Sequence, residues 1–201
     1  MKIAIISGSH RENSESGRVG RFIQSQIEAQ GHSTYVLDLA HTPLPLWDES
    51  MWGQEGVAAQ AFAPVSTALQ TVDAVVVIAA EWNGTVPAAL KNFFHYCSVK
   101  EFAHKPGFIV SITSGGTNGA YPVAELRMTS TKNNKLVYLP DHLIVRNAGK
   151  VFMENAEDSS GDAYLRERLA YSLNMLYAYA NAMKPIRESE VWMNDKYNFG
   201  M

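Results

Sequence analysis

Five short hydrophobic runs alternate along the chain with segments in which apolar residues recur at helical spacing. These runs are largely continuous rather than alternating, which indicates strands buried on both faces of a parallel sheet. The run at 74–80 holds three successive valines and predicts a central strand. The predicted strands are residues 2–6, 34–39, 74–80, 108–113 and 143–145. The predicted helices are residues 17–30, 57–71, 87–98, 120–132 and 162–183.

This alternation of strand and helix predicts an α/β fold with a five-stranded parallel sheet and helices on both faces. Short right-handed crossovers favour the strand order 2-1-3-4-5. We expect one domain over residues 1–201 with an irregular C-terminal tail at 184–201. The connection at 40–56 carries two tryptophans, and we interpret it either as a functional loop or as a surface loop with buried aromatic rings.

Composition narrows the class of protein further. The net charge of −3 over 201 residues gives no support for nucleic acid as a partner. Cys97, the single cysteine, excludes an internal disulfide and suggests a reducing compartment. The first apolar run is too short for a signal peptide, and no stretch approaches the length of a membrane span. We therefore expect a cytoplasmic protein with no membrane partner.

Three polar, glycine-rich loops follow the first, third and fourth predicted strands, at residues 7–16, 81–86 and 114–119. Parallel strands end at one edge of a sheet, and in the order 2-1-3-4-5 these three strands are neighbours at the topological switch point. The first loop opens a helix, where backbone N–H groups favour an anion. The loops therefore predict a mononucleotide cradle, with a phosphate at 9–16 and a ring system over 81–84 and 114–116.

Other kinds of site are disfavoured. The first loop lacks both G-x-G-x-x-G and the G-x-x-x-x-G-K-[ST] pattern of a P-loop. His95, His104 and His142 lie in unrelated segments without metal-ligand spacing, so no metal site is predicted. Cys97 sits in the apolar, aromatic-rich helix predicted at 87–98, and we interpret it as a core residue rather than a nucleophile.

The three loops of the sequence resemble those of a known family. The pattern Gly8-Ser9-x-Arg11-x-x-Ser14-x-Ser16 is similar to the phosphate loop of the NADPH-dependent FMN reductase family, whose members are flavodoxin-like quinone, chromate and azo reductases. The segment 81–87 resembles the P-E-Y-N-G-S-x-P loop of that family, and 114–116 resembles its third loop. Ala80, Trp82 and Ser16 depart from the family pattern, which usually has proline, tyrosine and asparagine there.

The resemblance implies a flavodoxin-like three-layer sandwich that binds FMN and assigns a role to each loop. The first loop would hold the FMN phosphate, the second would lie along the isoalloxazine ring, and the third would border its pyrimidine side. The implied FMN-binding residues are Ser9, Arg11, Ser14, Ser16, Glu81, Trp82, Asn83, Gly84, Ser114, Gly115 and Gly116. No side chain is assigned to catalysis, because the flavin carries the chemistry.

The implied activity is an NAD(P)H-dependent oxidoreductase. Hydride would pass from NADPH or NADH to bound FMN and then to a small acceptor such as a quinone, free flavin, azo compound or metal oxyanion. The alternatives are a flavodoxin-like electron carrier with a protein partner and a regulatory flavin-binding protein. The aromatic residues of the tail, costly to expose in a monomer, lead us to expect a homodimer or homotetramer.

Overall fold

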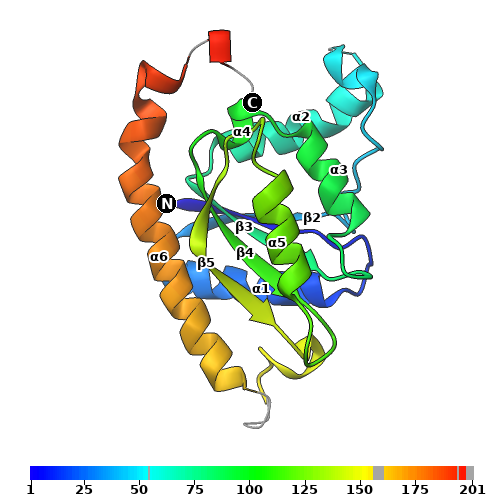
Figure 1. Cartoon of the computed structure of the whole chain (residues 1–201), viewed down its shortest axis with the longest axis vertical. Helices are drawn as coiled ribbons and strands as arrows, with labels where there is room; N and C mark the ends of the chain where they lie inside the picture. The colour runs from blue at the N-terminus through cyan, green and yellow to red at the C-terminus, as the bar shows by residue number, and fades with distance from the viewer. Residues whose placement is uncertain (54, 156–160, 194, 198–201) are drawn as a thin grey trace.

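The core of the protein, described here from a computed structural model, is a five-stranded sheet in the order β2-β1-β3-β4-β5 (Figure 1). Every neighbouring pair is parallel, which confirms the predicted flavodoxin-like arrangement. The structure describes residues 1–201 except 54, 156–160, 194 and 198–201. The strands are β1 (Lys2–Ser7), β2 (Ser33–Asp38), β3 (Ala74–Ala80), β4 (Pro106–Ile112) and β5 (Val137–Val145).

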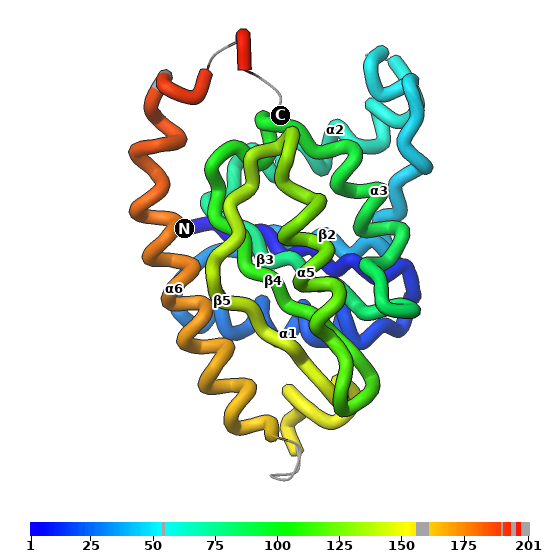
Figure 2. The backbone as a smooth tube through the Cα atoms, in the orientation of Figure 1, coloured from blue at the N-terminus to red at the C-terminus, as the bar shows by residue number. Residues whose placement is uncertain are grey.

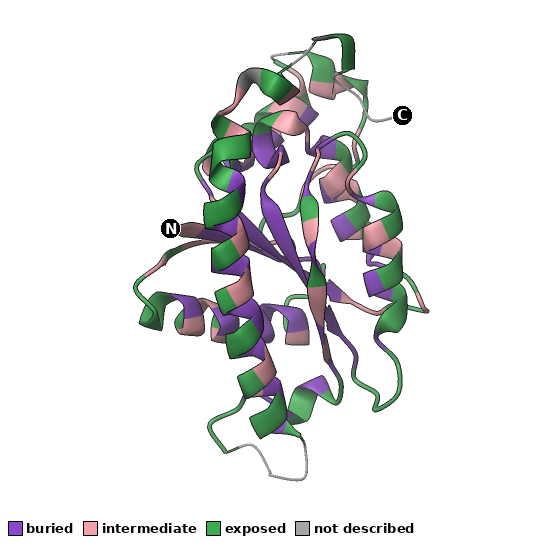
Figure 3. Cartoon of the chain, turned by 60° about the vertical axis from the view of Figure 1, so that its left-hand side comes forward, coloured by how far each residue is buried: buried purple, intermediate pink, exposed green. Residues whose placement is uncertain are grey.

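Helices cover both faces of the sheet and complete a three-layer sandwich (Figure 2). One face packs against α1 and α6 through one apolar cluster, and the other packs against α2, α3, α4 and α5 through a second cluster. Figure 3 shows buried strands between the helices, and β1, β3 and β4 are buried along most of their length, whereas the edge strands β2 and β5 are partly exposed. The helices are α1 (Glu15–Ala29), α2 (Val57–Gln70), α3 (Ala88–Tyr96), α4 (Val99–Phe102), α5 (Ala120–Thr129) and α6 (Asp162–Glu188).

Two strands, β4 and β5, begin two or more residues before the hydrophobic pattern predicts. β4 begins at Pro106, two residues before its predicted start, and includes Gly107. A β-carbon at position 107 would lie 2.9 Å from the Tyr138 ring on β5. Glycine therefore fits at this position of β4, where a larger residue would push against β5. β5 begins at Val137 rather than at residue 143, because its edge position leaves several of its residues half-exposed and interrupts the apolar run.

The predicted irregular tail at 184–201 is wrong at its start, because α6 continues through Pro185 to Glu188. Short 3-10 helices follow at Glu190–Trp192 and Asp195–Tyr197, while residues 194 and 198–201 lie outside the described residues. The connection at 40–56 also contains a 3-10 helix, Glu49–Trp52, and a further one spans Ala148–Lys150. Among the described helices, none is long and apolar enough to cross a membrane.

Candidate active site

The first loop is shorter than predicted and spans residues 8–14, because β1 extends to Ser7 and α1 begins at Glu15. The Gly8 amide donates to the Ile78 carbonyl of β3 at 2.9 Å. A β-carbon on Gly8 would lie 2.6 Å from the Leu90 side chain and 2.8 Å from that same carbonyl, so no other residue fits without a shift. The loop is also closed internally, because the buried Ser9 hydroxyl accepts from the Arg11 amide at 3.2 Å.

The first turn of α1 leaves hydrogen-bonding groups open toward the loop. Ser14 caps the helix, and its hydroxyl accepts from the Gly17 amide at 3.0 Å. The Glu15 and Ser16 amides have no acceptor within the described part of the chain. The Ser16 hydroxyl is buried and likewise lacks a partner among the described residues. A buried polar group without a partner is costly, so these groups mark a place for an acceptor such as an anion.

The second loop, residues 81–87, is a tight hairpin. Trp82 and Thr85 exchange both backbone hydrogen bonds, at 3.0 and 2.8 Å. Asn83 and Gly84 between them have φ values of 49° and 73°. Two successive positive φ values define a type I′ turn, for which Asn-Gly is the favoured pair. The hairpin carries the Trp82 side chain, 43% exposed, toward His10 and Arg11, whose ring and guanidinium lie 5.8 and 5.9 Å from the indole.

The third loop, residues 114–119, is held by the segment after β5. The Asn147 amide donates to the Gly115 carbonyl at 3.1 Å, and the Ala148 amide donates to the Thr113 carbonyl at 3.2 Å. Arg18 of α1 in turn donates to carbonyls of Ala148 and Phe152. The segment 147–152 therefore links the third loop to α1. The sequence does not predict that this segment supports the site, since no polar motif distinguishes it.

Two carboxylates join the second loop to α5. Glu81 accepts from the Gly119 amide at 2.6 Å, at the start of the helix, and Glu125 accepts from the Val86 amide at 2.8 Å. Glu125 also pairs with Lys91 at 2.6 Å. Burial would raise the pKa of Glu125, but the hydrogen bonds from Lys91 and Val86 outweigh it and lower the pKa. Both carboxylates thus hold the hairpin in a fixed position beside the third loop.

The three loops enclose one cavity of about 300 Å³ at the carboxyl ends of β1, β3 and β4. Its size is at the lower end of the ~300–1,000 Å³ range of small-molecule sites. The predicted residues that line it are Ser9, Arg11, Ser14, Ser16, Glu81, Trp82, Asn83 and Ser114. The predicted residues Gly84, Gly115 and Gly116 lie in the same loops but not on its wall. Four lining residues were not predicted: Glu15, Ala80, Ile112 and Thr113.

Thr113 could have been found from the sequence, because it is a polar residue that ends a hydrophobic strand beside the third loop. Its hydroxyl accepts from the Gly115 amide at 3.3 Å and so shapes the turn that follows β4. Ala80 and Ile112 are the last residues of β3 and β4, and only the alignment of the two strand ends in the sheet places them on the cavity wall.

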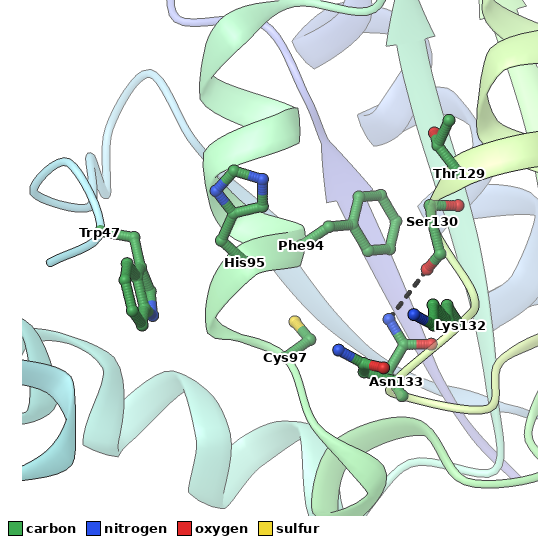
Figure 4. A pocket seen from close by; sticks show the side chains of 9 residues that line it. Trp47, Phe94, His95, Cys97, Thr129, Ser130, Lys132 and Asn133 are labelled. Carbon is green, nitrogen blue, oxygen red and sulfur yellow. Dashed lines mark hydrogen bonds between the residues drawn. The ribbon is translucent and has the colours of Figure 1, made fainter. Parts of the chain in front are cut away.

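A larger groove, of about 510 Å³, lies between α3 and the end of α5, away from the strand ends (Figure 4). Figure 4 shows Phe94 pointing from α3 toward Ser130, with Cys97 below it. Burial raises the pKa of the Cys97 thiol well above its usual value, which keeps it protonated and supports its interpretation as a core residue. None of the predicted site residues lines this groove.

A family model described as NADPH-dependent FMN reductase matches residues 1–150. The chain belongs to this family. Within it, the chain is 31% identical over 120 residues to an NADPH azoreductase of Bacillus sp. (strain OY1-2), a match that spans 59% of the chain and only 62% of the azoreductase. It is 24% identical to a quinone reductase of Escherichia coli (strain K12), over 93% of the chain and 97% of that protein.

Solved structures resemble this FMN reductase family member in fold. FerB of Paracoccus denitrificans, a flavoenzyme NAD(P)H:(acceptor) oxidoreductase, superposes with a TM-score of 0.68 at 16% identity, over 92% of this chain and 97% of FerB. An oxidoreductase of Corynebacterium diphtheriae gives a TM-score of 0.66 at 15% identity, over 90% and 97% of the two chains. Membership of the family implies FMN and a reduced nicotinamide as cofactors and confirms the resemblance seen in the sequence.

The hydrogen bond from the Gly119 amide to the Glu81 carboxylate leads us to predict an effect on stability. Replacing Glu81 with alanine leaves the amide of Gly119, the N-cap residue of α5, without its acceptor, which we expect to cost about 1–2 kcal/mol in the free energy of unfolding. Urea unfolding measures this cost. Glu12→Ala removes an exposed carboxylate of the first loop and should change stability by less than about 0.5 kcal/mol. Equal stability of the two variants would show that Glu81 does not support the loop.

Proposed function

We propose that the protein is an NAD(P)H-dependent oxidoreductase that binds FMN in the cavity between the three loops and reduces a small acceptor such as a quinone or an azo compound. The observation that carries this proposal is the buried Ser16 hydroxyl, without a partner among the described residues, beside open amides at the start of α1. A phosphate is the group whose charge and acceptors fit such a helix terminus.

In this proposal the first loop holds the phosphate. The Ser16 hydroxyl and the amides of Glu15 and Ser16 donate to its oxygens, and Arg11 at the rim adds a charge-assisted hydrogen bond. Ser9 and Ser14 fix the loop by their own hydrogen bonds to Arg11 and Gly17, so the donors are positioned before the ligand arrives. This preorganisation reduces the entropy lost on binding.

The second and third loops would place the ring system. The hairpin at Asn83 and Gly84 follows β3 and the exposed loop at 114–116 follows β4, so both lie at the carboxyl ends of neighbouring strands, and Trp82 lines the cavity there. Bound FMN would supply hydride and electron transfer between nicotinamide and acceptor. The chain's own contribution is to orient the ring and to leave one face open to both substrates in turn.

Ser16 provides a test of the phosphate site. Ser16→Ala should weaken FMN binding by about 10- to 100-fold, because a hydrogen bond to a charged group is lost. The apo protein should remain at least as stable as the wild type, since the variant removes a buried hydroxyl that has no described partner. Fluorescence titration of FMN and thermal unfolding measure the two effects.

Ser25→Ala is the matched control for this experiment, because Ser25 lies exposed on the same helix, where its hydroxyl donates to the Phe22 carbonyl and accepts from the Gln26 side-chain amide. Arg11→Ala should also weaken FMN binding while leaving the unfolding transition of the apo protein in place. The same FMN affinity in Ser16→Ala, Arg11→Ala and wild type would place the phosphate elsewhere.

The activity is tested by adding NADPH or NADH to the FMN-loaded protein without oxygen. We expect loss of the absorbance of oxidised flavin, followed by its recovery when a quinone or an azo compound is added and no other protein is present. Comparing the rates at which NADPH and NADH reduce the flavin shows which nicotinamide the protein prefers. A flavin that neither nicotinamide reduces would contradict the enzyme and favour an electron carrier that depends on a protein partner.

We also propose that the protein is a homodimer or homotetramer. In the connection at 40–56, Leu46 is 81% and Trp52 is 79% exposed, and the segment extends away from the sheet (Figure 2). Apolar side chains exposed together favour burial against a second copy. Analytical ultracentrifugation should give a mass of two or four chains, with Trp52→Ala dissociating more readily than Lys132→Ala. A concentrated wild type that sediments as a monomer would contradict this.

A further inference from the structure

A separate cavity, of about 310 Å³, lies at the opposite end of the sheet, where β3 and β4 begin. Its walls come from the end of α2, from α4 and from the last turns of α6, near the top of Figure 1. Trp192, which follows α6, forms another part of the wall. No residue lines both this cavity and the candidate active site, so its chemistry can be considered independently.

Lys105 is the first of two poorly exposed cations on this cavity. The residue is only 7% exposed, and its ammonium donates to the Leu69 carbonyl at 2.7 Å and to the Gln70 carbonyl at 3.3 Å. An ammonium has three donors, so one remains. Burial and the nearby charge of Arg187 lower the pKa of Lys105 to about 8, although Asp73 and Glu101 oppose this shift.

Arg187 is the second such cation, with its side chain 14% exposed. Its guanidinium donates to the Ala180 carbonyl at a long 3.4 Å, and it lies 3.7 Å from the carboxylate of Asp73. A guanidinium has five N–H donors, and its side chain has no closer acceptor within the described residues. Donors held away from water in this way are costly unless an acceptor meets them.

The remaining charges of the wall do not restore neutrality. Lys100 and Lys184 add two cations at the rim, and Glu188 is 3.7 Å from Lys184 in an exposed pair. Among the described lining residues, the only other carboxylate is that of Asp73, and one of its oxygens already accepts from the Lys2 amide at 2.9 Å. The Lys100 ammonium has no partner among the described residues. Positive charge therefore exceeds negative charge on the described wall.

Trp192 gives the cavity a flat apolar side. Its indole nitrogen donates to the Arg187 carbonyl at 3.2 Å, and its ring lies 5.5 Å from the His104 ring. The Lys135 ammonium lies 5.7 Å from the same indole. These contacts hold the indole beside the cations, as a surface against which a ring or sugar attached to an anion can pack.

We propose that this cavity binds a small phosphate dianion, either free phosphate or a phosphate monoester, between Lys105, Arg187 and Lys100. A tetrahedral dianion matches the open donors of the two poorly exposed cations and relieves the repulsion between them. This site is distinct from the proposed FMN phosphate site, because one cavity lies at the carboxyl ends of the strands and the other at their amino ends.

The test is calorimetric titration of inorganic phosphate into the FMN-loaded protein, with sodium chloride matching the ionic strength. FMN keeps the first loop filled, so added phosphate reports on the second cavity. We expect saturable binding of one phosphate per chain. Arg187→Gln should weaken it by about tenfold or more, since a charge-assisted hydrogen bond is lost. Lys132→Ala, which removes an exposed charge outside this cavity, should leave it unchanged.

Lys100→Ala keeps the test decisive if Arg187→Gln does not fold, because Lys100 is exposed and its removal should weaken binding severalfold. A parallel titration with adenosine monophosphate separates the two sources. Tighter binding of the monoester assigns the site to phosphate monoesters, and equal or weaker binding assigns it to free phosphate. No saturable binding by the wild type, or equal binding by wild type and Lys100→Ala, would overturn the proposal.

Discussion

The close approach of Gly8 to β3 determines where the candidate active site forms. The hydrogen bond from its amide to the Ile78 carbonyl draws the first loop across the end of the neighbouring strand. With any β-carbon at position 8 the loop would collide with Leu90 and with that carbonyl. The first turn of α1 therefore lines the cavity at the carboxyl ends of the strands, beside the switch point between β1 and β3 where an open α/β sheet accommodates a ligand.

The order of elements could be predicted from the sequence because the buried strands are continuous apolar runs. The bounds of β3, Ala74–Ala80, match the run itself, since this strand has neighbours on both edges and helices on both faces. Prediction was poorer at the sheet edge. β5 has one neighbouring strand and includes Pro140, and several of its residues are exposed. Only its last three residues therefore form an uninterrupted hydrophobic run. The end of α6 was missed because Pro185 is normally a helix-ending signal.

The site was predictable where its residues are local in the chain. The cap at Ser14 and the turn at Asn83 and Gly84 depend on spacings of two or three residues, which a sequence displays directly. The bonds from Glu81 to Gly119 and from Glu125 to Val86 join residues almost forty positions apart. No local pattern encodes such pairs, because they exist only once the sheet has placed the loops side by side.

The hairpin at 81–87 has a consequence for how this site can change in evolution. Its shape depends on the backbone bonds between residues 82 and 85 and on the turn residues Asn83 and Gly84. The side chain at position 82 takes no part in either, yet it stands at the opening of the cavity. An exchange of Trp82 for another aromatic or aliphatic residue can therefore alter which molecules enter while the loop keeps its conformation. At position 82, a substitution can therefore change the substrate range without changing the ability of the chain to fold.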